Sequence, residues 1–220
     1  MSEIDPNSII KRVSSCNRDI KLIIVGDSGT GKTSLVNKYI LNKFAQTYQA
    51  TIASQFSYKI IKIDDVLYRL QFWDLAGQDR SLEATGIFCQ GANGVIFCCE
   101  VKNRQSRENI IKWKESINNS IDTDKIPVII MENKCDILGE NENDYNEDFD
   151  SLKNFCAENK ICNCFRTSAL NGYGVDIAMN FLLKEIIKGF DNYIENDERE
   201  TVALSQSSRK LRCQKKNCCS

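Results

Sequence analysis

Apolar residues occur along the chain in short continuous runs, separated by stretches with helical spacing. The runs at residues 20–25, 94–101 and 126–131 are apolar almost throughout, as is typical of strands buried on both faces. Elsewhere apolar side chains recur with the period of a helix, which predicts helices over residues 34–41, 104–121, 151–159 and 176–190. Strands that alternate with helices predict an α/β fold with a mostly parallel central sheet and helices on both faces.

Two neighbouring stretches depart from that plan because their apolar and polar residues alternate. Residues 56–63 and 66–72 show this period of two, with a turn at residues 64–65 between them. They predict a β-hairpin, which adds one antiparallel edge to the sheet. We predict the last strand at residues 161–166 and a solvated acidic loop at residues 139–150.

The two ends of the chain lack the periodic pattern of the middle. Residues 1–18 predict a short, mobile, polar extension without the pattern of a secretion signal. Residues 191–200 are acidic, and residues 201–220 contain five basic side chains and no acidic one. We therefore expect one globular domain over residues 19–190 and a polar tail after it.

Composition and charge are typical of a soluble globular protein. The 29 basic and 30 acidic side chains nearly cancel, and we expect no nucleic acid among the partners. No apolar run reaches the ~18 residues that a membrane span requires. These features predict a protein of the cytosol unless another element anchors it.

The eleven cysteines do not predict a disulfide framework, because a chain of 220 residues can build a core without cross-links. Cys98 and Cys99 lie inside an apolar run and are expected to be buried, reduced thiols. Cys162 and Cys164 are expected at alternate positions of the last predicted strand. A zinc site is the alternative there, but the chain has no second cysteine pair nearby and no histidine.

The clearest motif is GDSGTGKTS at residues 26–34, which fits the pattern G-x-x-x-x-G-K-S/T between a predicted strand and a predicted helix. Glycines let the backbone approach an anion, so successive N–H groups and the positive end of the helix face phosphates. Lys32 adds a full positive charge, and the Thr33 hydroxyl is a hard ligand for Mg²⁺. The alternative is a glycine-rich turn that binds nothing.

A second motif, WDLAGQ at residues 73–78, follows the second strand of the predicted hairpin. Asp74 ends that strand and is predicted to hold Mg²⁺ through water. The N–H group of Gly77 is predicted to face a terminal phosphate. Gln78 is predicted to orient a water for in-line attack, since phosphoryl transfer depends mainly on positioning and charge stabilisation.

A third motif, NKCD at residues 133–136, follows another predicted strand and is suited to selecting a base. The carboxylate of Asp136 can accept two coplanar hydrogen bonds, which match the N1–H and N2–H₂ donors of guanine. Adenine offers no such pair and would leave the carboxylate unmatched. A fourth stretch, TSA at residues 167–169, ends the last strand, and the Ala169 N–H is predicted to meet the guanine oxygen.

All four motifs close a predicted strand. In a parallel sheet with crossovers the carboxyl ends of the strands lie at one edge, and ligands bind there. Motifs scattered by chance would have no reason to share that edge. The sequence therefore predicts one guanine nucleotide site with Mg²⁺ at this edge of the sheet.

Together these residues resemble the Ras superfamily of small GTPases, and within it the Rab family, over roughly residues 20–190. The resemblance implies a P-loop NTPase G domain that binds GTP or GDP. It also implies that Phe44 stacks on the guanine and that Thr51 reaches Mg²⁺ and the γ-phosphate.

The site residues follow from the motifs and the resemblance together. Catalytic roles are expected for Gln78, Lys32 and Thr51, and metal ligation for Thr33, Thr51 and Asp74. Effectors are expected to bind at the switch regions, where Phe56, Trp73 and Phe88 resemble the aromatic side chains at which Rab proteins present their switch state. Core packing is the alternative for these three. The nucleotide is expected to contact Ser28, Gly29, Thr30, Gly31, Lys32, Thr33, Ser34, Phe44, Thr51, Gly77, Asn133, Lys134, Asp136, Ser168, Ala169 and Leu170.

The tail strengthens the resemblance. Asn217 stands where a C-a-a-X prenylation motif would need a cysteine, and the ending Cys218-Cys219-Ser220 resembles Rab tails that carry lipid on two cysteines. Two lipid chains anchor a protein stably, and the basic residues upstream add attraction to anionic lipid. The alternative is a tail with free cysteines. The expected location is the cytoplasmic face of an intracellular membrane, in exchange with the cytosol.

The chain departs from the family pattern at three places. Residues 53–55 and 79–81 lie in the switch regions, so the partner surface is expected to differ. Glu132 is a charged residue where a small one is usual before NKxD, and it is expected to affect nucleotide affinity.

The resemblance implies a slowly hydrolysing switch of vesicle trafficking that works with an exchange factor, a GTPase-activating protein and a prenyl-binding dissociation inhibitor. Two other functions stay open. One is a nucleotide-locked scaffold that binds GTP with negligible hydrolysis. The intact Gln78 and Thr51 argue against it, and the altered first switch argues weakly for it. The other is a P-loop kinase, which NKCD argues against.

Overall fold

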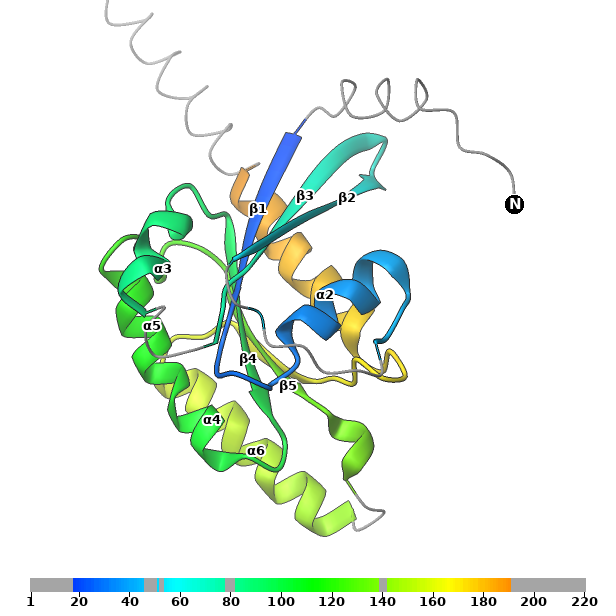
Figure 1. The fold of residues 1–220 in the computed structure, drawn as a ribbon, viewed down its shortest axis with the longest axis vertical. Coiled ribbons are helices and arrows are strands. Elements are labelled where there is room, and N and C mark those ends of the chain that lie inside the picture. The colour runs from blue at the N-terminus through cyan, green and yellow to red at the C-terminus, as the bar shows by residue number, and fades with distance from the viewer. Residues whose placement is uncertain (1–17, 46–50, 52–53, 78–81, 139–141, 191–220) are drawn as a thin grey trace, which may run out of the picture. The chain divides into compact units, whose positions relative to one another are not determined.

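The computed structural model describes residues 18–45, 51, 54–77, 82–138 and 142–190 (Figure 1). By its internal contacts the chain divides into two units, residues 1–182 and residues 183–220. The first unit contains the sheet and the site described below. In the second unit residues 183–190 are helical. The domain boundary that the sequence places at residue 190 stays a prediction.

Six strands form one sheet in the order β2-β3-β1-β4-β5-β6. They are β1 (Arg18–Val25), β2 (Gln55–Ile63), β3 (Val66–Asp74), β4 (Gly94–Glu100), β5 (Val128–Asn133) and β6 (Asn163–Arg166). β2 and β3 pair antiparallel, and every other neighbouring pair is parallel. The predicted α/β fold, mostly parallel with one antiparallel edge hairpin, is confirmed.

The turn between β2 and β3 forms where two aspartates follow one another. Asp64 has a φ of 45° and Asp65 has a φ of 65°. Two residues with positive φ make a turn whose twist matches that of the flanking strands, and aspartate tolerates this conformation. The predicted turn is therefore confirmed.

Helices lie on both faces of the sheet (Figure 1). On one face is α2 (Lys32–Leu41), whose Tyr39 packs against Phe72 of β3 with ring centroids 5.7 Å apart. On the other face are α3 (Leu82–Cys89), α5 (Ile110–Asn118) and α6 (Glu142–Glu158). The short helices α4 (Arg104–Glu108) and η2 (Cys135–Ile137) follow β4 and β5, and the last described helix covers residues 175–190. None of the helices in the described ranges has both the length and the apolar content needed to cross a membrane.

A large core cluster lies between the sheet and the helices α5 and α6. Ile110, Trp113 and Ile117 on α5 are buried in it at the helical spacing that the sequence shows. On β4, Cys98 and Cys99 are buried and their thiols are free. Their prediction as buried, reduced cysteines is confirmed.

The predicted acidic loop at residues 139–150 is wrong from residue 142 onward, because α6 begins at Glu142. Acidic residues are favourable in the first turns of a helix, where they interact with its positive end. A cluster of acidic residues at this place therefore starts a helix, although the same composition is also typical of a solvated loop.

Other predicted elements also differ from the structure. β6 begins at Asn163, so Cys164 lies in the strand and is buried, whereas Cys162 precedes the strand and is exposed. The helix predicted over residues 104–121 is divided at Asn109 into α4 and α5. α3 has no counterpart in the prediction, because its eight residues are too few to show a clear period.

The carboxyl ends of the parallel strands meet at one edge of the sheet. The stretches that follow β1, β3, β5 and β6 at this edge are the four motifs of the sequence. The fold therefore brings together stretches that are far apart along the chain.

Candidate functional site

The loop after β1 is shaped by glycines at which a side chain would clash. Gly26 has a φ of 143°, and a Cβ there would lie 2.0 Å from the carbonyl oxygen of Cys98. Gly31 has a φ of 95° and precedes α2, and a Cβ there would lie 2.3 Å from Nδ2 of Asn133. The backbone therefore curls tightly in front of the helix, as an anion-binding loop requires.

Lys32 is the first residue of α2 and is buried inside this loop. Its Nζ donates hydrogen bonds to the carbonyl oxygens of Gly26 at 2.8 Å and Asp27 at 2.9 Å. Burial lowers the pKa of the ammonium, and the nearby Cys98, Asp74 and Asp27 oppose that shift only in part. Burial disfavours the charged form of Lys32, so an anion bound in the loop would stabilise the protonated ammonium.

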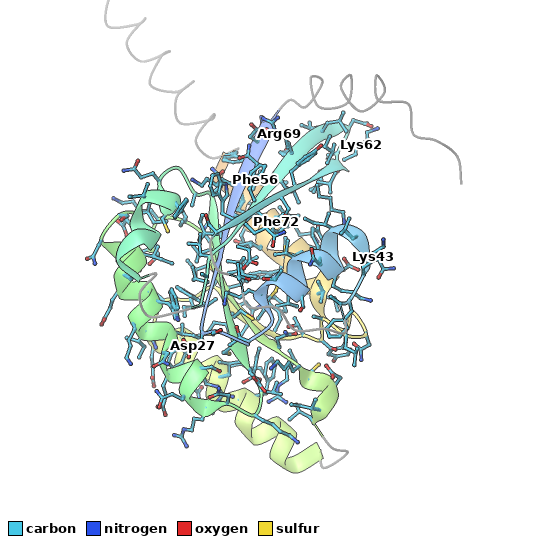
Figure 2. All side chains as sticks on the ribbon, in the orientation of Figure 1. Asp27, Lys43, Phe56, Lys62, Arg69 and Phe72 are labelled. Atoms are coloured by element: carbon cyan, nitrogen blue, oxygen red, sulfur yellow. The ribbon has the colours of Figure 1, made fainter. Side chains whose placement is uncertain are left out.

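Asp27, labelled in Figure 2, ties the loop to α5. Its carboxylate accepts hydrogen bonds from Asn109 Nδ2 at 2.8 Å and from Trp113 Nε1 at 2.9 Å. The sequence pattern assigns Trp113 only to a buried helix face and gives Asp27 and Asn109 no role. A buried tryptophan N–H usually has an acceptor, so a tryptophan on a buried helix face signals a polar partner without identifying it.

The three residues predicted as metal ligands meet beside this loop. Thr33 Oγ1 donates a hydrogen bond to Asp74 Oδ2 and lies 2.9 Å from Thr51 Oγ1. Thr33 belongs to α2, Asp74 ends β3, and Thr51 belongs to the segment before β2. The fold therefore places three oxygen ligands from separate segments at one point.

These oxygens fit a Mg²⁺ ion. Asp74 is 2% exposed, and its Oδ1 has no hydrogen-bond partner among the described residues. Burial raises the pKa of Asp74, while the hydrogen bond from Thr33 and the charge of Lys32 lower it in part. Carboxylate and hydroxyl oxygens are hard ligands, and a divalent cation would compensate the buried charge. The assignment of Thr33, Thr51 and Asp74 as its ligands stays a prediction.

Gly77, which follows β3, comes close to the same loop. A Cβ on Gly77 would lie 2.5 Å from Lys32 Nζ and 2.5 Å from the backbone nitrogen of Ser28. The Gly77 backbone is therefore beside the lysine, where a terminal phosphate is expected. Gln78, predicted to orient the attacking water, lies outside the described residues.

Asn133 joins the other loops of the site. It ends β5 and is 1% exposed. Its Nδ2 donates to the carbonyl oxygen of Thr30 at 2.9 Å, and its Oδ1 accepts from the N–H of Ala169 at 3.1 Å. A guanine oxygen would have to share that N–H with Asn133. One amide side chain therefore connects the phosphate loop, the end of β5 and the loop after β6.

Lys134 and Asp136 extend from this junction. Lys134 has a φ of 65°, and its Nζ donates to Glu100 Oε2 at 2.7 Å. Asp136 is exposed, and its Oδ1 accepts a hydrogen bond from the hydroxyl of the buried Ser168. Ser168 therefore orients the carboxylate, which still faces solvent and can receive a ligand.

The remaining residues predicted to contact the nucleotide lie in the loop after β1, at the start of α2 and in the segments that follow α2 and β6. Ser28, Gly29 and Thr30 belong to the loop, and Ser34 lies in the first turn of α2. The Thr30 side chain donates to the carbonyl oxygen of Asp27 at 2.9 Å and so supports the loop itself. Phe44 and Leu170 are 40% and 51% exposed, so neither side chain is committed to the core.

Phe56, Trp73 and Phe88 form one continuous aromatic set. Ring centroids are 5.3 Å apart between Phe56 and Trp73, and 5.9 Å apart between Trp73 and Phe88. Trp73 and Phe88 pack against the core. Phe56, which belongs to β2 and is labelled in Figure 2, is 51% exposed. The set therefore packs against the core through Trp73 and Phe88 and exposes an aromatic side chain, Phe56, at the surface.

Comparison with known proteins identifies relatives along most of the chain. Residues 21–188 match the model described as the Ras family. The chain is 34% identical to the Ras-related protein Rab7 of Gossypium hirsutum over 191 residues, covering 86% of this chain and 88% of that protein. It is 36% identical to the Ras-related protein RABG3c of Arabidopsis thaliana over 188 residues, covering 84% and 87%. It is 29% identical to the Ras-related protein Rab-32 of Sus scrofa over 203 residues, covering 90% and 88%.

Replacing Asn133 by alanine is predicted to lower the free energy of unfolding by about 2–4 kcal/mol. The loss follows because the Thr30 carbonyl and the Ala169 N–H are left in a buried site without partners. Urea unfolding followed by circular dichroism measures it. Asn171→Ala is the matched control, since Asn171 is exposed and accepts only a local bond from Tyr173, so a loss below about 1 kcal/mol is expected. Equal losses in the two variants would contradict the role of Asn133 as a junction.

Proposed function

The chain belongs to the Ras family and is Rab-like, and from that membership we propose that it is a small GTPase acting as a membrane-anchored switch in vesicle trafficking. It binds GTP and GDP with Mg²⁺ and hydrolyses GTP slowly. The observation that carries the proposal is the arrangement at one edge of the sheet. There the contact between Thr33 and Asp74 lies at one end and the Asn133 junction at the other, with the loop after β1 between them.

Guanine is the proposed base because of Asp136. Its carboxylate, oriented by Ser168, offers acceptors for the two coplanar donors of guanine. Adenine would leave this carboxylate without a match, which costs binding free energy. Asn133 and Ala169 would complete the contacts around the base.

Hydrolysis in this proposal depends on positioning rather than on covalent catalysis. Lys32 stabilises charge on the phosphate oxygens, Thr51 holds the first switch against the terminal phosphate, and Gln78 orients the attacking water. When bound, Mg²⁺ neutralises phosphate charge. We assign no arginine of this chain to the reaction, so turnover stays slow until a GTPase-activating protein completes the site.

The switch regions present the nucleotide state to partners in this proposal. The γ-phosphate orders both switches, and hydrolysis releases them. An effector binds the ordered state at the surface that includes Phe56, Trp73 and Phe88. An exchange factor releases GDP and so restarts the cycle.

Membrane attachment is proposed to occur through lipid on Cys218 and Cys219, which lie outside the described residues. Two chains provide stable anchoring, and a dissociation inhibitor that binds them would carry the GDP form through the cytosol. The protein would then work on the cytoplasmic face of an intracellular membrane.

Asp136→Asn is predicted to weaken GDP binding about 10- to 100-fold, because the amide reverses one hydrogen-bond requirement of guanine. Xanthosine diphosphate, whose base accepts at the changed position, should compete better in the variant. Competitive binding in the presence of Mg²⁺ measures both effects. Asp65→Asn, an exposed change in the hairpin turn, is the matched control and should leave binding unchanged. The base assignment fails if ATP competes with GDP as well as GTP does in the wild-type protein.

Gln78→Leu is predicted to slow phosphate release in a single turnover by about 10-fold or more, with GTP affinity unchanged, because the water is no longer oriented. Rapid-quench measurement of released phosphate gives the rate. Gln90→Leu, an exposed change just after α3, is the matched control. A wild-type protein that binds GTP but releases no phosphate, even with an activating protein, would be the nucleotide-locked scaffold instead.

The prenylated full-length protein is predicted to sediment with anionic vesicles, and Cys218→Ser/Cys219→Ser to remain in the supernatant. Each single variant should bind weakly and reversibly, because one lipid chain gives marginal affinity. Cys213→Ser in the same tail is the matched control and should sediment like the wild type. Sedimentation of the double variant at the wild-type level would rule out anchoring by the terminal cysteines.

A further inference from the structure

The charged side chains that are buried in the described part of the chain fall into two groups. Lys32 and Asp74 belong to the nucleotide site. Glu132 on β5 and Arg166 on β6 lie elsewhere, with 0% and 4% of their side chains exposed. Glu132 Oε2 and Arg166 Nε are 2.7 Å apart. This second group has no role in the site as described above.

A third residue completes the second group. Arg107 on α4 is 12% exposed at its side chain, and its Nη2 donates to Glu132 Oε1. Each oxygen of the Glu132 carboxylate therefore meets a guanidinium, one from α4 and one from β6. We call Arg107, Glu132 and Arg166 the Glu132 triad. The Arg166 guanidinium also lies 5.1 Å from the ring centroid of Phe149 on α6.

Two members of the Glu132 triad, Glu132 and Arg166, lie immediately before the two loops that are proposed to read the base. Glu132 precedes Asn133, and Arg166 is two residues before Ser168. Glu132 and Arg166 are register partners in the parallel pair of β5 and β6. The Glu132 carbonyl oxygen also accepts from the Thr167 N–H at 2.9 Å. The ion pair therefore fixes the last rung of the sheet before the two loops separate.

The loop after β6 is packed closely on Arg166. A Cβ on Gly174 would lie 2.1 Å from the carbonyl oxygen of Arg166, and the Ser168 N–H donates to the carbonyl oxygen of Tyr173 at 3.0 Å. A shift of Arg166 would therefore move this loop as well. Ser168 would move with it, and its hydroxyl is the group that orients Asp136.

We propose that Glu132 and Arg166 are positioning residues for guanine recognition. Their ion pair sets the separation between the loop that carries Asp136 and the loop that carries Ser168. Arg107 holds the same carboxylate from α4, which carries neither loop, so its contribution to base selectivity is smaller. A buried ion pair is a weak source of stability, and in some proteins a buried polar residue instead fixes the register of packed elements. The inference rests on the proposed function, since it concerns the same base.

The ratio of the dissociation constants for inosine diphosphate and GDP tests this inference. Inosine lacks the 2-amino group, so it uses one acceptor of Asp136 where guanine uses two. Displacing Asp136 therefore costs GDP more than inosine diphosphate. A general loss of stability weakens both nucleotides alike, because they share the ribose and phosphate contacts. Glu132→Gln keeps the shape of the side chain and removes its charge, and we expect the ratio to fall at least about fivefold.

Two lysine variants distinguish an effect on the position of the base loops from a general effect of disturbing the buried charges. Arg166→Lys and Arg107→Lys both keep a positive charge near the same carboxylate and lose the planar guanidinium. Only Arg166 lies on a strand that leads into a base loop. We expect the ratio to fall at least about threefold in Arg166→Lys and to stay within about twofold of wild type in Arg107→Lys. These variants also carry the test if Glu132→Gln does not fold.

Ile129→Ala is the matched control for stability. Ile129 is a fully buried residue of β5 outside the Glu132 triad. This variant should unfold at a lower temperature and keep the wild-type ratio.

An unchanged ratio in both Glu132→Gln and Arg166→Lys, with a selective wild-type protein, would overturn the inference. An equal fall in Arg107→Lys and Arg166→Lys would overturn it as well. A wild-type protein without preference for guanine over adenine would refute the proposed function itself, and the inference with it.

Discussion

The rest of the site depends on the two hydrogen bonds that the amide side chain of Asn133 makes. A primary amide carries a donor and an acceptor, and in Asn133 the donor meets the Thr30 carbonyl and the acceptor meets the Ala169 N–H. The loop after β1 and the loop after β6 are therefore held by the same buried group. The glycine at position 31 is part of this arrangement, because the Asn133 amide occupies the space that a Cβ would need. Position 31 must therefore be glycine because position 133 is asparagine, and the two residues depend on each other.

The parts of the fold and site that could be predicted from sequence are those encoded locally. Buried strands, the hairpin and its aspartate turn depend on neighbouring residues, and the loop motifs depend on short fixed spacings. The bond between Asp27 and Trp113 and the pairing of Glu132 with Arg166 join residues far apart along the chain. No local pattern encodes such pairs, so Glu132 is visible in the sequence only as an unusual charge. The start of α6 is hidden in the sequence for another reason, since acidic composition suits both a helix start and a solvated loop.

The two groups of buried charges differ in how their charge is compensated. Lys32 donates to neutral carbonyl oxygens, and Asp74 keeps one buried oxygen without a protein partner among the described residues. These groups can gain free energy from a ligand. The carboxylate of Glu132 instead meets guanidinium groups on both of its oxygens, so the protein itself supplies the counter-charges. A buried charge that is compensated by a ligand is typical of a binding site, and a buried charge that is compensated by other side chains is typical of a structural ion pair.

The buried thiol of Cys98 affects how the protein can be labelled. Cys98 lies under the loop after β1, with its Sγ 3.5 Å from the Thr30 carbonyl oxygen. Burial raises the pKa of Cys98 and of Cys89 to about 11, and because the thiolate is the reactive form, both thiols are unreactive at neutral pH. Maleimides and mild oxidants should therefore spare both. Among the described cysteines Cys162 is exposed, at the amino end of β6, so a fluorophore placed there would stand on the opposite edge of the sheet from the proposed nucleotide site.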